Sequence, residues 1–243
     1  MKNKGLLTAV AVIVIVLGGF ALFQGFQKDN KSAKTTTSTT SNQKQYTVGV
    51  LQLMSHPALD QIYEGIKEGL AEEGLKEGEN LTINFQNGQG DQSKLNTMSQ
   101  QLVQDKSEVL IGIATPAAQA LDNNVKKKDI PIVLGAVTDP EGAGLVASND
   151  APGANITGVS DQPPVEEIIA LAKKMLSNAK KVGMLYASSE ANSKFQVTKA
   201  SEKAKELGME VVNKPVASTN EVAQTVQILA NEVDFVFIPL DNT

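Results

Sequence analysis

The residues of this sequence that could do chemistry or bind a ligand gather in short polar segments that follow apolar runs. YASSEANS at 186–193 and PLDNT at 239–243 are rich in acidic, amide and hydroxyl groups. Glu190 has three alternative roles there: a first-turn acid in a helix capped by Ser188 or Ser189, a ligand for a cationic group, or a catalytic acid. Catalysis needs a second acid or base at a defined separation, and no pattern supplies one.

The composition argues against several classes of enzyme and partner. The chain contains no Cys, which excludes a thiol nucleophile, a disulfide framework and a thiolate metal site. His56 is the one histidine, so a zinc centre or a Ser-His-Asp triad is disfavoured. The net charge of -5 and the lack of a basic stripe argue against a nucleic-acid partner. We therefore predict no metal, no cofactor and no enzymatic activity.

The N-terminal segment has the pattern of a membrane anchor. Lys2 and Lys4 precede an uncharged apolar run at 5–23, which is near the length of a membrane-spanning helix. Lysines before such a run favour a cytoplasmic N-terminus, so the rest of the chain is expected outside the cell. We predict a signal anchor at 1–26, with a cleaved signal peptide as the alternative. Residues 27–45, rich in Thr, Ser and Lys, are expected to form a flexible tether.

The elements that position the polar segments alternate between strand and helix from position 46 onward. The helical spacing of apolar residues over 58–74 predicts a helix, and further helices are expected after a cap at Asp91 and a cap at Thr115. This β-α-β-α order predicts a mainly parallel sheet that is covered on both faces by helices. The predicted strands are YTVGVLQL at 46–53, NLTINFQ at 80–86, SEVLIGIA at 107–114 and IPIVLGA at 130–136.

The same plan starts again in the second half of the chain. VGVL at 48–51 and VGML at 182–185 are separated by the same number of positions as Gly74 and Gly208, two glycines that suit helix ends. We therefore predict two α/β lobes of Rossmann-like topology, at 46–160 and 161–243. The second lobe should begin with a helix near Pro163, after a linking region that is rich in Gly, Pro and Asn.

Ligands of open parallel sheets bind beyond the C-terminal ends of the strands. Two lobes that face each other with these ends form a cleft, and the helix N-termini there attract anions. In the first lobe the corresponding loops are MSHP at 54–57, QNGQGD at 86–91, ATP at 114–116 and AVTDP at 136–140. In the second lobe they are the two segments at 186–193 and 239–243.

Seven motifs in order resemble one family. HPALD, NGQGD, ATPAAQA, VTDP, GANITGVSD, YASSEANS and PLDNT together look like the tryptophan/tyrosine-type ABC transporter substrate-binding proteins, over residues 46–243. The resemblance implies a two-lobed type I periplasmic-binding fold that delivers an aromatic amino acid to a membrane permease. Unlike the family's common lipoproteins, this chain has no lipobox Cys, so we expect its N-terminal helix to anchor it. It also ends earlier than the family pattern, and we expect its second lobe to be incomplete.

An amino-acid ligand assigns roles to particular residues. Its ammonium needs a carboxylate, for which the resemblance favours Glu190 and Asp241. Its carboxylate suits Thr115 with the amides after Pro116, or Ser55. The full set of predicted ligand-binding residues is Ser55, His56, Asn87, Thr115, Pro116, Thr138, Asp139, Ser189, Glu190, Asn192, Ser193, Asp241 and Asn242.

Structural roles remain open for several of these residues. Asp241 could serve only as a turn residue, Thr115 only as a helix cap, and Asp139, before a proline, only to shape its loop. His56 could be a loop residue or a neutral hydrogen-bonding wall of the cleft. Two further functions also remain possible, an extracellular sensor domain of the same fold and a secreted α/β enzyme that uses Glu190, Asp139 or Asp241.

Overall fold

The computed structural model describes residues 44–125 and 129–243. In these residues no helix is long and apolar enough to cross a membrane. The predicted anchor at 1–26 and nearly all of the predicted tether at 27–45 lie outside them.

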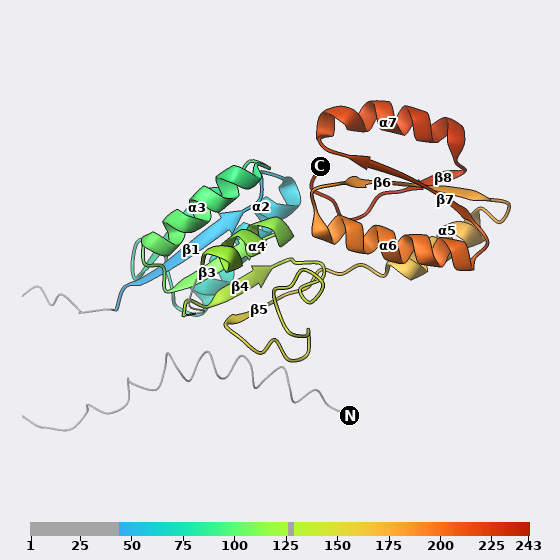
Figure 1. Ribbon diagram of the computed structural model, residues 1–243. Coiled ribbons are helices and arrows are strands. Elements are labelled where there is room, and N and C mark those ends of the chain that lie inside the picture. Colours follow the sequence, from blue (N-terminus) through green and yellow to red (C-terminus); the bar gives the residue numbers. More distant parts are fainter. Residues whose placement is uncertain (1–43, 126–128) are drawn as a thin grey trace, which may run out of the picture. The chain divides into compact units, whose positions relative to one another are not determined.

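A five-stranded parallel sheet forms the first half of the described chain (Figure 1). Its order is β2-β1-β3-β4-β5, so β1 pairs with both β2 and β3. The strand β5 lies inside the region that was predicted to be only a link between the lobes, and it pairs in parallel with β4. The strands are β1 (Tyr46–Gln52), β2 (Leu81–Asn87), β3 (Val109–Ile113), β4 (Ile132–Gly135) and β5 (Ile156–Gly158).

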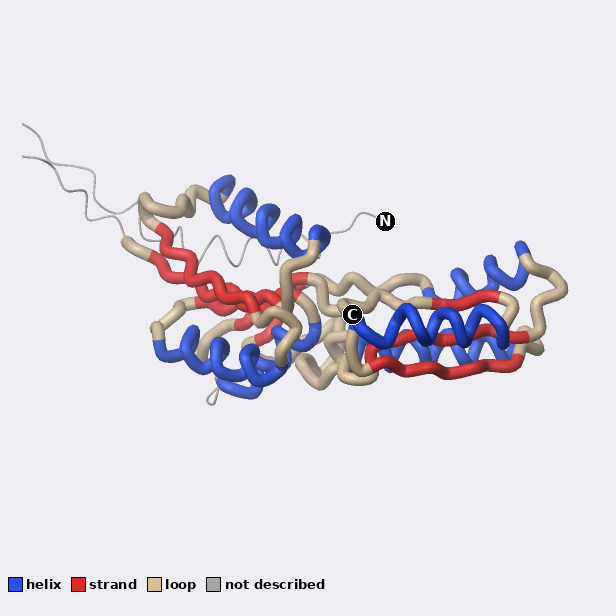
Figure 2. Tube along the Cα trace, turned by 90° about the horizontal axis from the view of Figure 1, so that it is seen from above, coloured by secondary structure: helices blue, strands red, loops and turns tan. Residues whose placement is uncertain are grey.

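Helices cover both faces of this sheet, as the sequence predicted (Figure 2). Successive side chains of β1 point to opposite faces. Gln52 therefore meets Asp60 of α2 (Pro57–Glu72) on one face, whereas Gly49 lies against Leu102 of α3 (Gln92–Gln104) on the other. The helix α4 (Thr115–Asn124) packs beside α3, where the buried Ser99 hydroxyl donates a 2.8 Å hydrogen bond to the carbonyl of Ala120.

The second half builds a smaller parallel sheet in the order β7-β6-β8. Val182 and Met184 of β6 pack with α5 and α6 on one face, and Leu185 packs against Leu229 of α7 on the other. Figure 1 shows α7 on one side of the sheet and α6 on the opposite side. The elements are α5 (Val165–Met175), β6 (Lys181–Ala187), α6 (Ala191–Glu206), β7 (Glu210–Val216), α7 (Thr219–Glu232) and β8 (Phe235–Phe237).

The two halves repeat one local plan, as the spacing of the motifs predicted. The orders β2-β1-β3 and β7-β6-β8 are equivalent. Gly74 and Gly208 follow the ends of α2 and α6 with φ of 83° and 74°, a conformation that favours glycine. A Cβ added at Gly183 would lie 2.8 Å from Leu229 of α7, just as one at Gly49 would crowd α3. The duplication is thus present in the packing as well as in the sequence.

Candidate functional site

Glu190 is the N-cap residue of α6, and its side chain turns into the protein instead of capping the helix. It is 5% exposed, and Oε2 accepts hydrogen bonds from Asn192 Nδ2 at 3.1 Å and Asn242 Nδ2 at 2.6 Å. No side chain caps α6, so the predicted cap at Ser188 or Ser189 is wrong. The helix begins at Ala191, which is later than either serine cap would require, because Glu190 itself has an extended conformation.

Burial gives Glu190 an unusual electrostatic environment. Loss of solvent raises the pKa of its carboxyl, and the negative charge of Asp241 raises it further. The hydrogen bonds from Asn242 and Asn192 lower the pKa but do not cancel the effect of burial. Among the described residues, no ion pair supplies Glu190 with a cation. The site therefore holds a buried carboxyl group whose hydrogen-bond donors are amides.

Both carboxylate oxygens of Asp241 accept hydrogen bonds from other residues of the protein. Oδ2 accepts hydrogen bonds from the backbone N–H of Ala187 at 2.6 Å and from Ser193 Oγ at 2.7 Å, and Oδ1 accepts one from the backbone N–H of Thr243 at 2.8 Å. These bonds join the end of β6, the start of α6 and the segment after β8. They give Asp241 a structural role of the kind that its turn-residue alternative described.

Five of the predicted residues thus come together in the second lobe, namely Glu190, Asn192, Ser193, Asp241 and Asn242. Asn192 is 4% exposed and donates to Glu190 Oε2 and to the carbonyl of Leu240, while its Oδ1 is buried with no hydrogen-bond partner in the described residues. Ser189 lies apart from this network, exposed in the turn before α6.

In the first lobe, Asn87 and Ser55 meet across two neighbouring strand ends. Asn87 Nδ2 donates to Ser55 Oγ at 3.0 Å, and Asn87 Oδ1 accepts from the backbone N–H of Gln89 at 2.9 Å. His56 is the N-cap of α2, because its Nδ1 accepts a 3.2 Å hydrogen bond from the backbone N–H of Ala58. Nδ1 therefore acts as the acceptor that caps the first turn of the helix.

Thr115 is not the cap of α4, although the sequence predicted that it would be. Ala114 is the N-cap, with φ 75° and ψ 155°, and no side chain caps the helix. The reason is long-range: the backbone N–H of Ala114 is bound to the carbonyl of Gly135 in the neighbouring strand, while its own carbonyl already accepts from Ala118. The chain must therefore turn from strand to helix at Ala114 alone. Its positive φ is strained for a residue with a side chain, and backbone strain of this kind is common at binding sites.

The segment after β4 holds Thr138 and Asp139, both buried. Asp139 Oδ1 accepts a 3.1 Å hydrogen bond from the backbone N–H of Gly142, and a Cβ at Gly142 would collide with this carboxylate. The carbonyl of Thr138 accepts from Ser160 Oγ at 2.9 Å. Asp139 therefore shapes its own loop, which agrees with the structural alternative.

Sequence reasoning missed Gln52, the last residue of β1. Its side chain is fully buried, and Nε2 donates to Asp60 Oδ1 at 2.7 Å and to the carbonyl of Met54 at 2.8 Å. Its Oε1 has no hydrogen-bond partner within the described ranges. The sequence did contain an indication of this role, because Gln52 ends an apolar strand and a buried amide needs hydrogen-bond partners.

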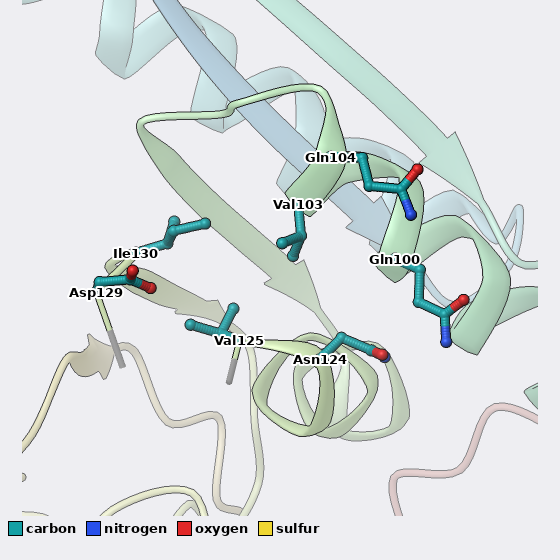
Figure 3. Close-up of a pocket in the computed structure, with 7 residues that line it drawn as sticks. All are labelled: Gln100, Val103, Gln104, Asn124, Val125, Asp129 and Ile130. Carbon is teal, nitrogen blue, oxygen red and sulfur yellow. The ribbon is translucent and has the colours of Figure 1, made fainter. Parts of the chain in front are cut away.

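A separate cavity of about 630 Å³ lies near the start of β4, away from the predicted ligand-binding residues (Figure 3). It is bordered by the C-terminal parts of α3 and α4 and by the residues just before β4. It contains none of the predicted ligand-binding residues, so it is not the candidate site. Its lining residues are Gln100, Val103, Gln104, Asn124, Val125, Asp129 and Ile130.

Metal binding has no support in residues 44–125 and 129–243. No group of three or more His, Cys, Asp or Glu side chains there could hold a metal ion. What the described site offers is a buried carboxylate, amide and hydroxyl groups, and helix N-termini.

Comparison with known proteins finds a matching family model and similar proteins. Residues 47–243 match a family model described as ABC transporter substrate binding protein. The whole chain is 38% identical over 242 residues to a tyrosine-binding protein of Clostridioides difficile (strain R20291), and it covers 69% of that protein.

Two solved structures are also similar. An ABC domain from Streptococcus pneumonia in complex with L-Trp shares 48% identity, with a TM-score of 0.77 over 82% of this chain and 67% of that one. The ligand-free, open structure of a substrate binding protein with adhesive properties from Clostridium difficile shares 40% identity, with a TM-score of 0.58 over 81% of this chain and 66% of that one. The chain thus spans about two thirds of the length of these relatives.

Proposed function

Because this chain belongs to the family of ABC transporter substrate-binding proteins, we propose that it binds an aromatic amino acid between its two lobes. The family binds solutes, so the chain is a binding protein and not an enzyme, as the sequence predicted. Two relatives support the ligand class: one is called tyrosine-binding, and another was crystallised with L-Trp.

The observation that carries the proposal is the environment of Glu190. A carboxylate that is 5% exposed, with two amides as its hydrogen-bond donors, is stabilised strongly when a cation comes within contact distance. The ammonium of an amino acid is such a cation and has three N–H donors. The buried Asn192 Oδ1, which has no partner within the described chain, is a second acceptor beside it.

We propose that the ligand's carboxylate binds at the first lobe. The N-terminus of α4 has no side-chain cap, so the backbone N–H groups of Thr115 and Ala117 are the candidates for binding an anion. Pro116 has no N–H, and the N–H of Ala118 binds the Ala114 carbonyl. Ser55 and Asn87 offer polar groups at the neighbouring strand ends. The hydrogen bond between these two side chains sets their positions before a ligand arrives.

We further propose that the binding domain lies outside the cell and hands its ligand to an ABC permease. The lysines before the apolar run at 5–23 and the polar tether after it support an anchored, extracellular domain. A cleaved signal peptide would give a secreted protein and remains the alternative for this segment.

A thermal-shift screen of the chain against the twenty common amino acids tests this function. A ligand that binds only the folded state at about 100 times its Kd stabilises that state by about 2.7 kcal/mol. We expect tryptophan or tyrosine to raise the Tm and acidic or basic amino acids to leave it unchanged. If no amino acid raises the Tm, the proposal is wrong.

A further inference from the structure

The side chain of Gln196 makes two hydrogen bonds to the backbone of Leu240, which is 44 positions away in the chain. Gln196 lies on α6 and is fully buried. Its Oε1 accepts a 2.9 Å hydrogen bond from the backbone N–H of Leu240, and its Nε2 donates to the carbonyl of the same residue at 3.1 Å. Nε2 also donates to the carbonyl of Asn192 at 3.2 Å, so every polar atom of this buried amide has a partner.

Leu240 needs this support because neither pairing nor burial fixes it. The pairing of β6 with β8 ends at Phe237, before Leu240 is reached. The Leu240 side chain is 47% exposed, so packing of the side chain contributes little to holding the backbone. Side chains of α6 take the place of a neighbouring strand, since Gln196 and Asn192 both donate to the Leu240 carbonyl.

The residues that follow Leu240 are those of the candidate site. Asp241 bonds to Ala187 and Ser193, and Asn242 bonds to Glu190. Asn242 is two residues after Leu240, so a shift of the Leu240 backbone is passed through Asp241 to the Asn242 amide, which is one of the two amide donors to the Glu190 carboxylate.

We infer that Gln196 is a positioning residue for ligand binding, because it fixes the Leu240 backbone and thereby places Asn242 against Glu190. This inference rests on the proposed function. Both polar atoms of the Gln196 side chain are bound to the backbone of Leu240 and Asn192, so its effect on the ligand passes through Leu240.

The test replaces Gln196 with Met, which is similar in size but makes none of the three hydrogen bonds. Gln196→Glu is the second variant, because it keeps the acceptor for the Leu240 N–H and loses the amide donor. The first readout is the affinity for L-tryptophan by calorimetry, and the second is hydrogen exchange of the Leu240 amide. We expect Gln196→Met to weaken affinity about tenfold or more and to speed that exchange. Gln196→Glu should also weaken affinity, because its carboxylate would face the carbonyls of Leu240 and Asn192.

Ser99→Ala is the matched control, since it removes a buried hydrogen bond between α3 and α4. It should lower the Tm but leave affinity within about twofold of wild type. The inference is overturned if Gln196→Met keeps wild-type affinity, or if Ser99→Ala weakens binding equally. Where Gln196→Met does not fold, wild-type affinity in Gln196→Glu overturns it.

The failure of this inference and the failure of the proposed function can be told apart. If the wild-type chain binds no aromatic amino acid, the proposed function is wrong. Hydrogen exchange then decides the positioning role alone. Faster exchange of the Leu240 amide in Gln196→Met but not in Ser99→Ala supports it, and unchanged exchange in Gln196→Met overturns it.

Discussion

Glu190 Oε2 lies 2.6 Å from Asn242 Nδ2, although the two residues are 52 positions apart in the chain. The contact joins the N-cap of α6 to the segment that follows β8. The site in the second lobe is therefore assembled from separate segments that the parallel sheet brings to one edge. The hydrogen bonds to the Glu190 carboxylate therefore depend on how firmly these segments are held.

Replacing Glu190 with Gln should weaken amino-acid binding strongly and leave the fold intact. The change keeps the shape of the side chain but removes the charge that we propose binds the ligand's ammonium. A hydrogen bond to a charged group contributes about 1.5–3 kcal/mol, so the Kd should rise about tenfold to a hundredfold. Calorimetry with L-tryptophan measures this. Glu202→Gln, an equal charge change at an exposed position of α6, should leave the Kd unchanged, and a similar loss in that control would contradict the account.

The stability of the ligand-free chain should depend on pH through Glu190. Burial raises the pKa of this carboxyl in the folded state, so the folded state binds more protons than the unfolded state between the ordinary and the raised pKa. The free energy of unfolding should therefore decrease as pH rises through that window. Glu190→Gln should remove this part of the pH dependence in urea unfolding, and an unchanged profile in the variant would show that Glu190 does not titrate abnormally.

Asp241→Ala should destabilise the second lobe. The change leaves the backbone N–H of Ala187 and the Ser193 hydroxyl without their acceptor. Loss of partners by buried polar groups costs about 1–3 kcal/mol of unfolding free energy. Asp150→Ala, at an exposed position, should change stability by less than about 0.5 kcal/mol. Equal stability of the two variants would show that the Asp241 bonds contribute nothing.

Two glycine substitutions should have opposite effects on stability. A Cβ at Gly112 would lie 2.7 Å from the Cα of Ala118, so Gly112→Ala must push α4 away from β3. It should cost about 1–3 kcal/mol. Gly65 lies in the interior of α2 with nothing within 4 Å of an added Cβ, so Gly65→Ala should stabilise by about 0.5–1 kcal/mol. Chemical denaturation measures both, and a stabilising Gly112→Ala would refute the close packing of α4 on β3.

Much of the fold could be predicted from the sequence because local patterns of apolar residues and glycines indicate its strands and helices. Apolar runs and helical spacing indicated parallel strands with helices on both faces, and Gly74 and Gly208 marked equivalent helix ends. The strand β5 was missed because it is three residues long and lies in a segment rich in Gly, Pro and Asn. It exists only through its pairing with β4, which no local pattern encodes.

Within the site, residue types were easier to predict than their partners. The polar cluster at 186–193 and 239–243 was recognised, but the caps at Thr115 and at Ser188 or Ser189 were not correct. The start of α4 is set by the bond between Ala114 and Gly135, which are far apart in sequence.

Gln196 was missed for the same long-range reason, since its partner Leu240 is 44 positions away. A signal for it exists in α6. The buried positions Asn192, Gln196, Ala200 and Ala204 lie on one face of the helix, and this face changes from apolar to polar toward the helix N-terminus.

The most direct test of the central claim compares L-tryptophan with indole-3-propionate, which has the same ring and carboxylate but no ammonium. Calorimetry on the purified chain should show saturable binding of L-tryptophan or L-tyrosine. The corresponding acid without the amino group should bind about tenfold or more weakly, because Glu190 loses its cation. Equal affinity for the two compounds, or no binding of any aromatic amino acid, would contradict the account.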